Sequence, residues 1–402
     1  MTLSALPISY CTNVHAGRTV AEVDAGLDDY TTRVREASGK PLAAGLWLAR
    51  SAVSELLESD DLLKRFHDRL NQRELPCYTL NTFPFGDFHS ERVKENVYLP
   101  DWTTDERRDY TLDCAKVLSV LLPDGMEGSL STLPLGGRMN QCSQNFHEEC
   151  YEQLIQTAKA LSVLHQETGR CIRLAVEPEP CCHISSIPHL AVPIFNDLRD
   201  YAASKNALDE VTEYIGLCFD VCHQAVEFED IAESIGLLVE NGVRINKLHI
   251  SNAIELTNPE TNREGREALA RFVEPRYLHQ TFAKHSSGEI FSRFDLDTRD
   301  VLRDEADYSE FDRAEAWRIH YHVPVNAEEL GPLQTTRTEL KQALGLVAAL
   351  DYAPHLEIET YTWEVLPDGK SVDLVTGLCQ EIEATGELLS EIRTNQVSNG
   401  TT

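Results

Sequence analysis

The sequence predicts a single (β/α)₈ barrel on two main observations. Short apolar or β-branched runs alternate with longer stretches of helical period, the pattern of βα units around a parallel sheet, and eight such runs can be counted. The length of 402 residues suits one barrel with long loops, because such barrels extend from about 200 to more than 400 residues. We therefore expect one domain over residues 1–393 and a frayed tail over residues 394–402.

The expected elements follow one another in regular order. The strands are Ile8–Asn13, Ala44–Leu48, Pro76–Asn81, Gly128–Thr132, Ile172–Glu177, Ile215–Asp220, Ile245–His249 and His355–Glu359. Amphipathic stretches predict helices at about Val20–Ala37, Ala52–Leu70, Thr104–Leu121, Glu148–Thr168, Ile194–Lys205, Ile231–Asn241 and Thr335–Leu350. A last helix, Ser371–Arg393, follows the eighth strand and closes the ring.

Two connections are too long for simple βα loops. The first, Thr82–Trp102, follows the third strand and is rich in aromatic residues and proline, a composition suited to a packed lid. The second, Ser251–Gln334, follows the seventh strand and contains one strand-like run, Arg318–Val323. Both should lie at the carboxyl-end face of the barrel, where barrel enzymes hold their active sites.

The charge balance restricts the partners. There are 66 acidic and 36 basic residues, which gives a formal net charge of −30. A surface this acidic repels phosphate backbones, so we expect a small-molecule substrate and neither nucleic acid nor an anionic membrane as partner. No apolar run reaches the roughly 18 uncharged residues of a membrane span, and the N-terminus MTLSALPISYCTNVH has no signal-peptide pattern. A cytoplasmic protein without membrane insertion is the expectation.

The last four strands each end in a side chain that can bind a metal ion. These side chains are Glu177, Asp220, His249 and Glu359. A buried carboxylate is costly unless a cation or hydrogen bonds compensate its charge, and adjacent parallel strands, about 4.8 Å apart, bring their ends together. Oxygen and imidazole ligands suit Mn²⁺, Mg²⁺, Co²⁺ or Zn²⁺. The sequence thus predicts a divalent-metal site, with a set of structural polar contacts as the alternative.

Two of these positions have rivals nearby. Glu357 lies two residues before Glu359 and faces the same way, but Glu359 is nearer the carboxyl end of its strand and is preferred. Glu179 is the weaker rival of Glu177, because it follows Pro178 and falls outside the strand.

Further polar residues are candidates for a second metal ion or for substrate binding. His223 forms an Asp-x-x-His pair with Asp220 at a strand-to-helix turn, and His320 and His322 are two apart in an extended run, so their imidazoles face one way. The alternative for the latter pair is two exposed histidines on a surface strand. His15, Asn81 and His89 follow the first and third strands and are candidate substrate contacts.

The order Glu, Asp-x-x-His, His, Glu on strands five to eight resembles the xylose-isomerase-like barrel superfamily of sugar and sugar-phosphate isomerases and epimerases and apurinic endonucleases. The resemblance implies that Glu177, Asp220, His249 and Glu359 hold the metal, and it places His223 at the motif's first histidine. In the endonucleases, histidines ending strands three and four complete a three-metal site. Here those strands end in Asn81 and Thr132, so a three-zinc phosphodiesterase is not expected.

More narrowly, several long segments resemble EboE, a family of metabolite traffic proteins. These segments are SYCTNVH, LNTFPFGDFH, VKENVYLPDWTT, AVEPEP, CFDVCH and HLEIETYTWEVLP, and they span essentially the whole chain. The family occurs in a bacterial gene cluster with a prenyltransferase-like membrane protein. The resemblance therefore implies partners in a prenyltransferase-linked pathway, without specifying a reaction.

Three functional hypotheses follow. The first is a metal-dependent isomerase or epimerase that acts on a polyhydroxylated carbonyl compound, a sugar or sugar phosphate, with Glu177 and Glu359 as proton donor and acceptor. The second is a metal-dependent hydrolase with a binuclear site, in which His320 and His322 hold the second ion. The third is a non-catalytic metabolite-binding component of a membrane-adjacent pathway.

Overall fold

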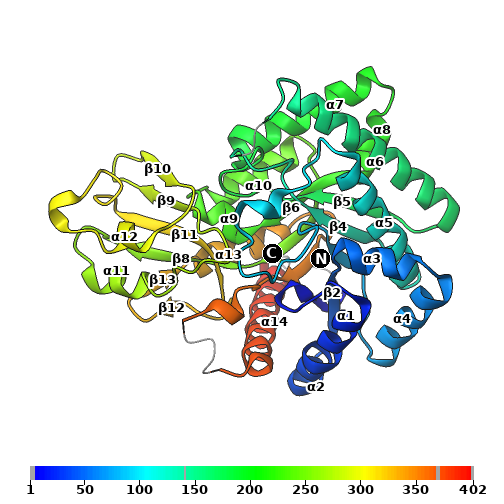
Figure 1. The fold of residues 1–402 in the computed structure, drawn as a ribbon, viewed down its shortest axis with the longest axis horizontal. Coiled ribbons are helices and arrows are strands. Elements are labelled where there is room, and N and C mark those ends of the chain that lie inside the picture. The colour runs from blue at the N-terminus through cyan, green and yellow to red at the C-terminus, as the bar shows by residue number, and fades with distance from the viewer. Residues whose placement is uncertain (1–4, 140–141, 368–371, 400–402) are drawn as a thin grey trace.

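The computed structural model describes residues 5–139, 142–367 and 372–399. Eight parallel strands close into a barrel in the order β1-β14-β7-β6-β5-β4-β3-β2, with helices around it (Figure 1). The strands are β1 (Ile8–Cys11), β2 (Leu42–Trp47), β3 (Thr79–Asn81), β4 (Gly128–Thr132), β5 (Ile172–Val176), β6 (Ile215–Asp220), β7 (Ile245–Ile250) and β14 (His355–Ile358). All eight predicted strands are present, and the predicted (β/α)₈ barrel is confirmed.

The helices follow the predicted order with differences in detail. They are α1 (Val20–Gly26), α2 (Thr32–Ser38), α3 (Arg50–Leu57), α4 (Asp60–Gln72), α5 (Asp105–Leu121), α6 (Phe146–Thr168), α7 (Val192–Ser204), α8 (Leu208–Tyr214), α9 (Val221–Val226), α10 (Ile231–Glu240), α11 (Arg263–Leu269), α12 (Thr298–Val301), α13 (Arg337–Val347) and α14 (Leu374–Asn399). Among the helices of the described residues, none is long and apolar enough to cross a membrane.

Three helix predictions need correction. The stretch expected as one helix over Ala52–Leu70 is two helices, because Ser59 adopts an extended backbone and begins α4 with two aspartates in its first turn, where the helix dipole favours negative charge. Helices α8, α9, α11 and α12 are short and were not predicted. Helix α14 continues to Asn399, past the expected end at residue 393, so residues 394–399 are helical; residues 371 and 400–402 lie outside the described part of the chain.

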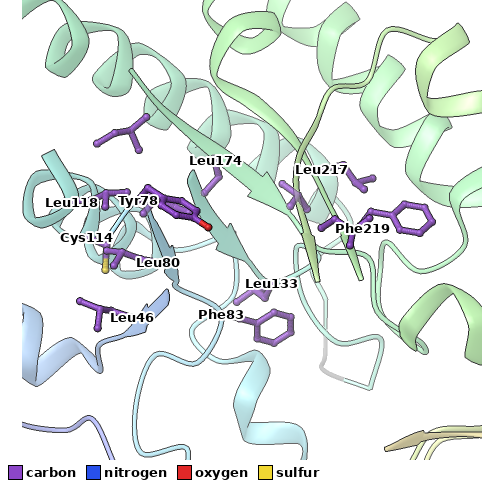
Figure 2. Close-up of a cluster of buried hydrophobic side chains, with 14 of the residues drawn as sticks. Leu46, Tyr78, Leu80, Phe83, Cys114, Leu118, Leu133, Leu174, Leu217 and Phe219 are labelled. Carbon is purple, nitrogen blue, oxygen red and sulfur yellow. The ribbon is translucent and has the colours of Figure 1, made fainter. Parts of the chain in front are cut away.

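The core of the barrel is continuous from the strand interior to the helices. Buried side chains such as Leu80 on β3 and Cys114 and Leu118 on α5 belong to one cluster (Figure 2). The strands are buried on both faces, as parallel strands in barrels are. This rigid sheet is what positions the residues at its carboxyl ends.

The long segment after β7 is a small sheet with its own core, of which only one strand was predicted. Strands β8 (Asn252–Thr257), β9 (Thr281–Lys284), β10 (Ile290–Arg293), β11 (Ala316–Val323), β12 (Glu329–Leu330) and β13 (Leu333–Thr335) pair in the order β10-β9-β11-β8-β13-β12. This sheet projects to one side of the barrel (Figure 1). Its buried residues, among them Leu256, Trp317 and Ile319, form a cluster separate from the barrel core.

The segment after β3 is packed, as its composition indicates. Phe88, Tyr98 and Trp102 are buried, and the guanidinium of Arg107 on α5 donates to the backbone carbonyls of Thr82, Phe83 and Pro100. The backbone N–H groups of Val93 and Lys94 donate to the carbonyl of Arg276 in the second insertion. The two insertions therefore meet over the barrel mouth.

Candidate metal centre

The four predicted ligand residues lie together at the carboxyl ends of neighbouring strands. Asp220 is the last residue of β6 and is in register with His249 on β7. Glu177 and Glu359 directly follow β5 and β14, and the backbone N–H of Glu359 donates to the carbonyl of Ile250 at the end of β7. One oxygen or nitrogen from each of the four side chains lies within 4.8 Å of the others.

The imidazole of His249 is the centre of this group. Its Nδ1 lies 2.9 Å from Oε2 of Glu359, 3.2 Å from Oδ2 of Asp220 and 3.3 Å from Oε1 of Glu177. All four side chains are buried, and within the described part of the chain no hydrogen bond reaches Oε2 of Glu177. Three converging carboxylates with one unsatisfied oxygen fit a divalent cation, which is how proteins tolerate buried negative charge.

The side-chain pKa values reflect the crowding of negative charge. Burial raises the pKa of Glu177 to about 7, and the neighbouring carboxylate of Glu359 adds to this effect. Burial alone would lower the pKa of His249, yet the surrounding negative groups, including Glu359 and Glu177, hold it well above its usual value. Without a cation, the group therefore retains protons at neutral pH.

Glu359, and not Glu357, belongs to this group. Glu357 lies one layer deeper in the barrel, where the ammonium of Lys247 is 2.6 Å away and the hydroxyl of Ser9 donates to its Oε2 at 2.8 Å. Its Oε1 is 3.4 Å from Nε2 of His249, the ring nitrogen opposite the one that faces Glu177, Asp220 and Glu359.

A second set of possible ligands adjoins the first. Asp220, His223 and His322 offer ligand atoms within 4.8 Å of one another, and so do Cys222, His320 and His322. Nδ1 of His322 lies 2.7 Å from the carbonyl of Glu359, which can only accept a hydrogen bond. In the neutral imidazole, Nε2 then carries the lone pair; this atom is buried without a hydrogen-bond partner in the described structure and lies 3.9 Å from Oδ2 of Asp220. Asp220 is thus shared by both sets.

His223 and His320 face each other beside this second set. Nδ1 of His223 donates to the carbonyl of Pro178 at 2.9 Å, and Nδ1 of His320 lies 2.7 Å from the amide oxygen of Gln280. Both Nε2 atoms then carry lone pairs, and they are 3.1 Å apart. Two facing lone pairs repel unless a proton or a cation lies between them. All three histidines are buried, so the alternative of exposed histidines on a surface strand is wrong.

A cavity lies above the candidate ligands. Its volume, measured as the space open to the centre of a water molecule, is about 60 Å³, and both insertions contribute to its walls. Glu179, the rival rejected from sequence, lines it and accepts hydrogen bonds on Oε1 from the hydroxyl of Tyr98 at 2.7 Å and the amide of Gln280 at 3.1 Å. Burial raises the pKa of Glu179 to about 8.

The three candidate substrate contacts lie in different places, and only Asn81 lines the cavity. Asn81 lines the cavity, and its amide donates to Oε1 of Glu359 at 2.7 Å. His15 instead hydrogen-bonds the hydroxyl of Tyr10 at 2.8 Å and stacks on Tyr30, and His89 packs against Trp47. The structure does not bring His15 or His89 to the cavity wall, because both side chains point into packed aromatic clusters instead.

Asn13 was not selected as a site residue from the sequence. Its amide also donates to Oε1 of Glu359, at 2.8 Å. The sequence does contain a pattern that indicates this position, since Asn13 ends the first predicted strand and strand ends converge at the barrel mouth. The cavity residues of the second insertion, such as Tyr277 and Leu278, had no comparable signal.

No protein-family model matches the chain, and no curated protein matches it, so the narrower resemblance to EboE stays a prediction. Solved structures similar to the chain include the IolI protein with a bound zinc atom, at 11% identity and TM-score 0.47 over 96% of this chain and 99% of that one. A D-tagatose 3-epimerase-like protein matches at 10% identity and TM-score 0.48, over 97% and 99%. A xylose isomerase domain protein from Salmonella typhimurium matches at 11% and TM-score 0.40, over 97% and 99%. Each TM-score lies below 0.5, so the function of this chain has to be inferred from the geometry of its own site.

Proposed function

We propose that the protein is a metal-dependent isomerase or epimerase that acts on a polyhydroxylated carbonyl metabolite. The observation that carries this proposal is the convergence of Glu177, Asp220, His249 and Glu359 within 4.8 Å of one another at the mouth of the barrel, directly below a cavity that Glu177 and Glu359 line. Acid–base side chains and ligands for a cation therefore line the same cavity.

The donor set determines what the cation contributes. Glu177, Asp220, His249 and Glu359 would hold Mn²⁺, Mg²⁺, Co²⁺ or Zn²⁺, ions that accept mixed oxygen and imidazole ligands. When bound, such an ion polarises carbonyl and hydroxyl oxygens, which favours formation of an enediolate.

Glu177 is the side chain best arranged to move the proton. Its Oε1 lies 3.3 Å from Nδ1 of His249, among the other ligand atoms, whereas its Oε2 has no hydrogen-bond partner among the described residues, so Oε2 is available to accept a proton while Oε1 would hold the cation. In the proposed step, Oε2 removes the proton from the carbon beside the carbonyl. It then returns that proton to the former carbonyl carbon, while the proton of the neighbouring hydroxyl passes to the former carbonyl oxygen, which completes an isomerisation.

Glu359 is held differently from Glu177. The amides of Asn13 and Asn81 both donate to its Oε1, which favours the ionised carboxylate and fixes its position. Its role in the proposal is to hold the cation, and it becomes the second base only if the reaction is an epimerisation, which needs a base on each face of the substrate. His223, on the cavity wall, would orient substrate oxygens.

The proposal is tested by metal analysis and by proton exchange. The protein, loaded with each of the four ions in turn, is incubated with hydroxyacetone or dihydroxyacetone in D₂O, and the loss of the carbinol protons is followed by NMR. We expect metal-dependent exchange that falls by about 10²-fold or more in Glu177→Gln and is unchanged in Glu255→Gln, a carboxylate paired with Arg318 in the insertion sheet. Exchange that is independent of metal and of Glu177 would refute the proposal.

A binuclear hydrolase is the second candidate. The facing Nε2 atoms of His223 and His320 and the unsatisfied Nε2 of His322 favour a second cation that shares Asp220 with the first. Two bound ions could hold and activate a water molecule between them. Elemental analysis separates the candidates: two ions per chain, reduced to one in His322→Gln, would support the hydrolase, and one ion per chain would support the isomerase.

The pathway role rests on the sequence resemblance alone. We propose that the site serves metabolite traffic in a prenyltransferase-linked pathway at the cytoplasmic side of a membrane. If the protein is instead a non-catalytic binding component, Glu177→Gln will abolish metal binding and leave the interaction with its pathway partners intact.

A further inference from the structure

The cavity above the candidate metal centre has two chemically different walls. Its floor carries the carboxylates and histidines, among them Glu177, Glu359 and His223, together with Asn13 and Asn81. The rest of its lining is formed largely by apolar and aromatic side chains from the two insertions and from the loop after β14. A ligand that fills this space contacts both polar atoms and aromatic rings.

Three rings form the centre of the apolar wall, and we call them the aromatic roof. Phe88 comes from the first insertion, Tyr277 from the second and Tyr361 from the loop after β14. Their ring centroids are 5.0 Å apart for Phe88 and Tyr277, 5.3 Å for Phe88 and Tyr361, and 5.0 Å for Tyr277 and Tyr361. These separations are typical of packed aromatic pairs, so the roof is a preformed apolar surface made by three distant segments.

The charges on the cavity wall disfavour an anionic group on the ligand. Among the described residues that line the cavity, Lys94 is the one lysine or arginine. Its ammonium lies 2.7 Å from the carboxylate of Asp295, so its charge is already neutralised. Three carboxyl groups, those of Glu177, Glu179 and Glu359, line the same cavity. A phosphate normally requires arginine, lysine or a helix N-terminus as partner.

We infer that the substrate is a non-phosphorylated hydroxycarbonyl compound with an uncharged apolar substituent, which binds with its oxygens on the metal centre and its apolar group under the aromatic roof. This inference depends on the proposed function for the polar end of the ligand. It replaces the broader expectation of a sugar or sugar phosphate by a narrower class.

The experiment uses three probes that share one chelating head. Acetohydroxamate, benzohydroxamate and phosphonoacetohydroxamate offer the same pair of oxygens to a metal ion but differ in the attached group: methyl, phenyl or phosphonate. Their dissociation constants are measured by calorimetry on the full-length, metal-loaded protein. Burial of roughly 60 Å² more apolar surface predicts about tenfold tighter binding of benzohydroxamate than of acetohydroxamate. Phosphonoacetohydroxamate is expected to bind no more tightly than acetohydroxamate.

A matched pair of variants locates the apolar end of the probe. Tyr277→Ala removes a ring of the roof, and Tyr277→Phe keeps the ring and removes only the hydroxyl, which donates to the carbonyl of Phe88 at 3.3 Å. The benzohydroxamate advantage should fall to about threefold or less in Tyr277→Ala and persist in Tyr277→Phe. Unchanged binding of acetohydroxamate in both variants would show that the metal site is intact.

Each outcome bears on one of the two ideas or on both. If acetohydroxamate binds but benzohydroxamate gains nothing, or if the phosphonate binds most tightly, the substrate inference is wrong and the proposed function stands. An advantage that survives Tyr277→Ala also overturns the inference, because the phenyl group must then lie elsewhere. If none of the three probes binds the metal-loaded protein, both the inference and the proposed metal centre fail.

Discussion

Two adjacent layers of the barrel interior both contain buried carboxylates, but their charges are balanced differently. At the mouth, Glu177, Asp220 and Glu359 converge on His249. One layer deeper, Glu357 lies 2.6 Å from the ammonium of Lys247, and both side chains are fully buried. Gly45 on β2 leaves space for the Glu357 carboxylate, which a Cβ atom at that position would meet. The deeper layer is therefore closed and internally neutral.

Glu177 at the mouth and Glu357 in the deeper layer have pKa shifts of opposite sign. Burial raises the pKa of Glu177 to about 7. Burial acts on Glu357 in the same direction, but the ammonium of Lys247 and the nearby imidazole of His249 outweigh it and lower its pKa to about 2. The deeper layer has one ammonium for its one carboxylate, whereas at the mouth three carboxylates share the single imidazole of His249. This difference leads us to treat the deeper layer as structure and the mouth as a binding site for an external cation.

The largest effect is expected when the deeper layer loses its cation. Lys247→Met leaves the Glu357 carboxylate buried and unpaired, which should reduce the free energy of unfolding by about 3–5 kcal/mol. Denaturant unfolding of the metal-free protein measures it. Lys205→Met is the matched control, because Lys205 pairs with Glu152 at the surface, where both side chains are more than 40% exposed, and its loss should cost less than about 1 kcal/mol. Equal effects would mean that the deeper pair contributes no more than a surface pair.

The mouth should respond to the metal ion instead. A cation present at 100 times its dissociation constant stabilises the folded protein by about 2.7 kcal/mol, so addition of a chelator should lower the melting temperature of the wild-type protein. In Asp220→Asn the metal-dependent rise should disappear. Asp113→Asn, which removes a carboxylate paired with Arg50 and Lys116 on the outside of the barrel, should keep the full rise.

The contrast between the layers also shows what the sequence could reveal. The four ligand positions were predicted because each ends a strand, and parallel strands bring their ends to one place. The preference for Glu359 over Glu357 followed from the same rule. Lys247 had a usable signal too, since it lies two residues before His249 and must face the same interior; a lysine in an otherwise apolar strand indicates a buried partner.

Other parts of the site had no local signal. The aromatic roof joins Phe88, Tyr277 and Tyr361, and no local pattern states which distant loops meet. The insertion sheet was missed except for one strand, because β10, β12 and β13 are only two to four residues long and no periodicity can be read from so few positions. His15 and His89 were assigned to the site because they follow strands, but packing against neighbouring rings decided their positions.

A smaller effect is expected from pH, and its sign follows from Glu177. The pKa of this carboxyl group is raised to about 7 in the metal-free protein, so its proton must leave before a cation binds. The loss of this proton alone should raise metal affinity by about tenfold between pH 6 and pH 8, and His249, whose pKa is also raised, should release a second proton on binding. The raised pKa of Glu177 has the opposite effect on the metal-free protein. Its contribution to the free energy of unfolding is largest below the pKa that this group has in the unfolded chain, and it is lost as the pH rises through about 7. Calorimetry in buffers of different ionisation enthalpy measures the released protons, and Glu177→Gln should remove the contribution of Glu177 to the pH dependence.

The smallest effect compares two hydrogen-bond donors near the end of β1, one for each layer. The amide of Asn13 donates to Glu359 at the mouth, and the hydroxyl of Ser9 donates to Glu357 below it. Asn13→Ala removes one of the two amide donors that fix Glu359 and should weaken metal binding about fivefold, equivalent to about 1 kcal/mol, with little change in metal-free stability. Ser9→Ala should do the opposite, because it lowers metal-free stability by about 1 kcal/mol and leaves metal affinity within twofold of the wild-type value. If both substitutions changed metal affinity equally, the two layers would act as one coupled network, and the separation between a structural layer and a binding layer would be wrong.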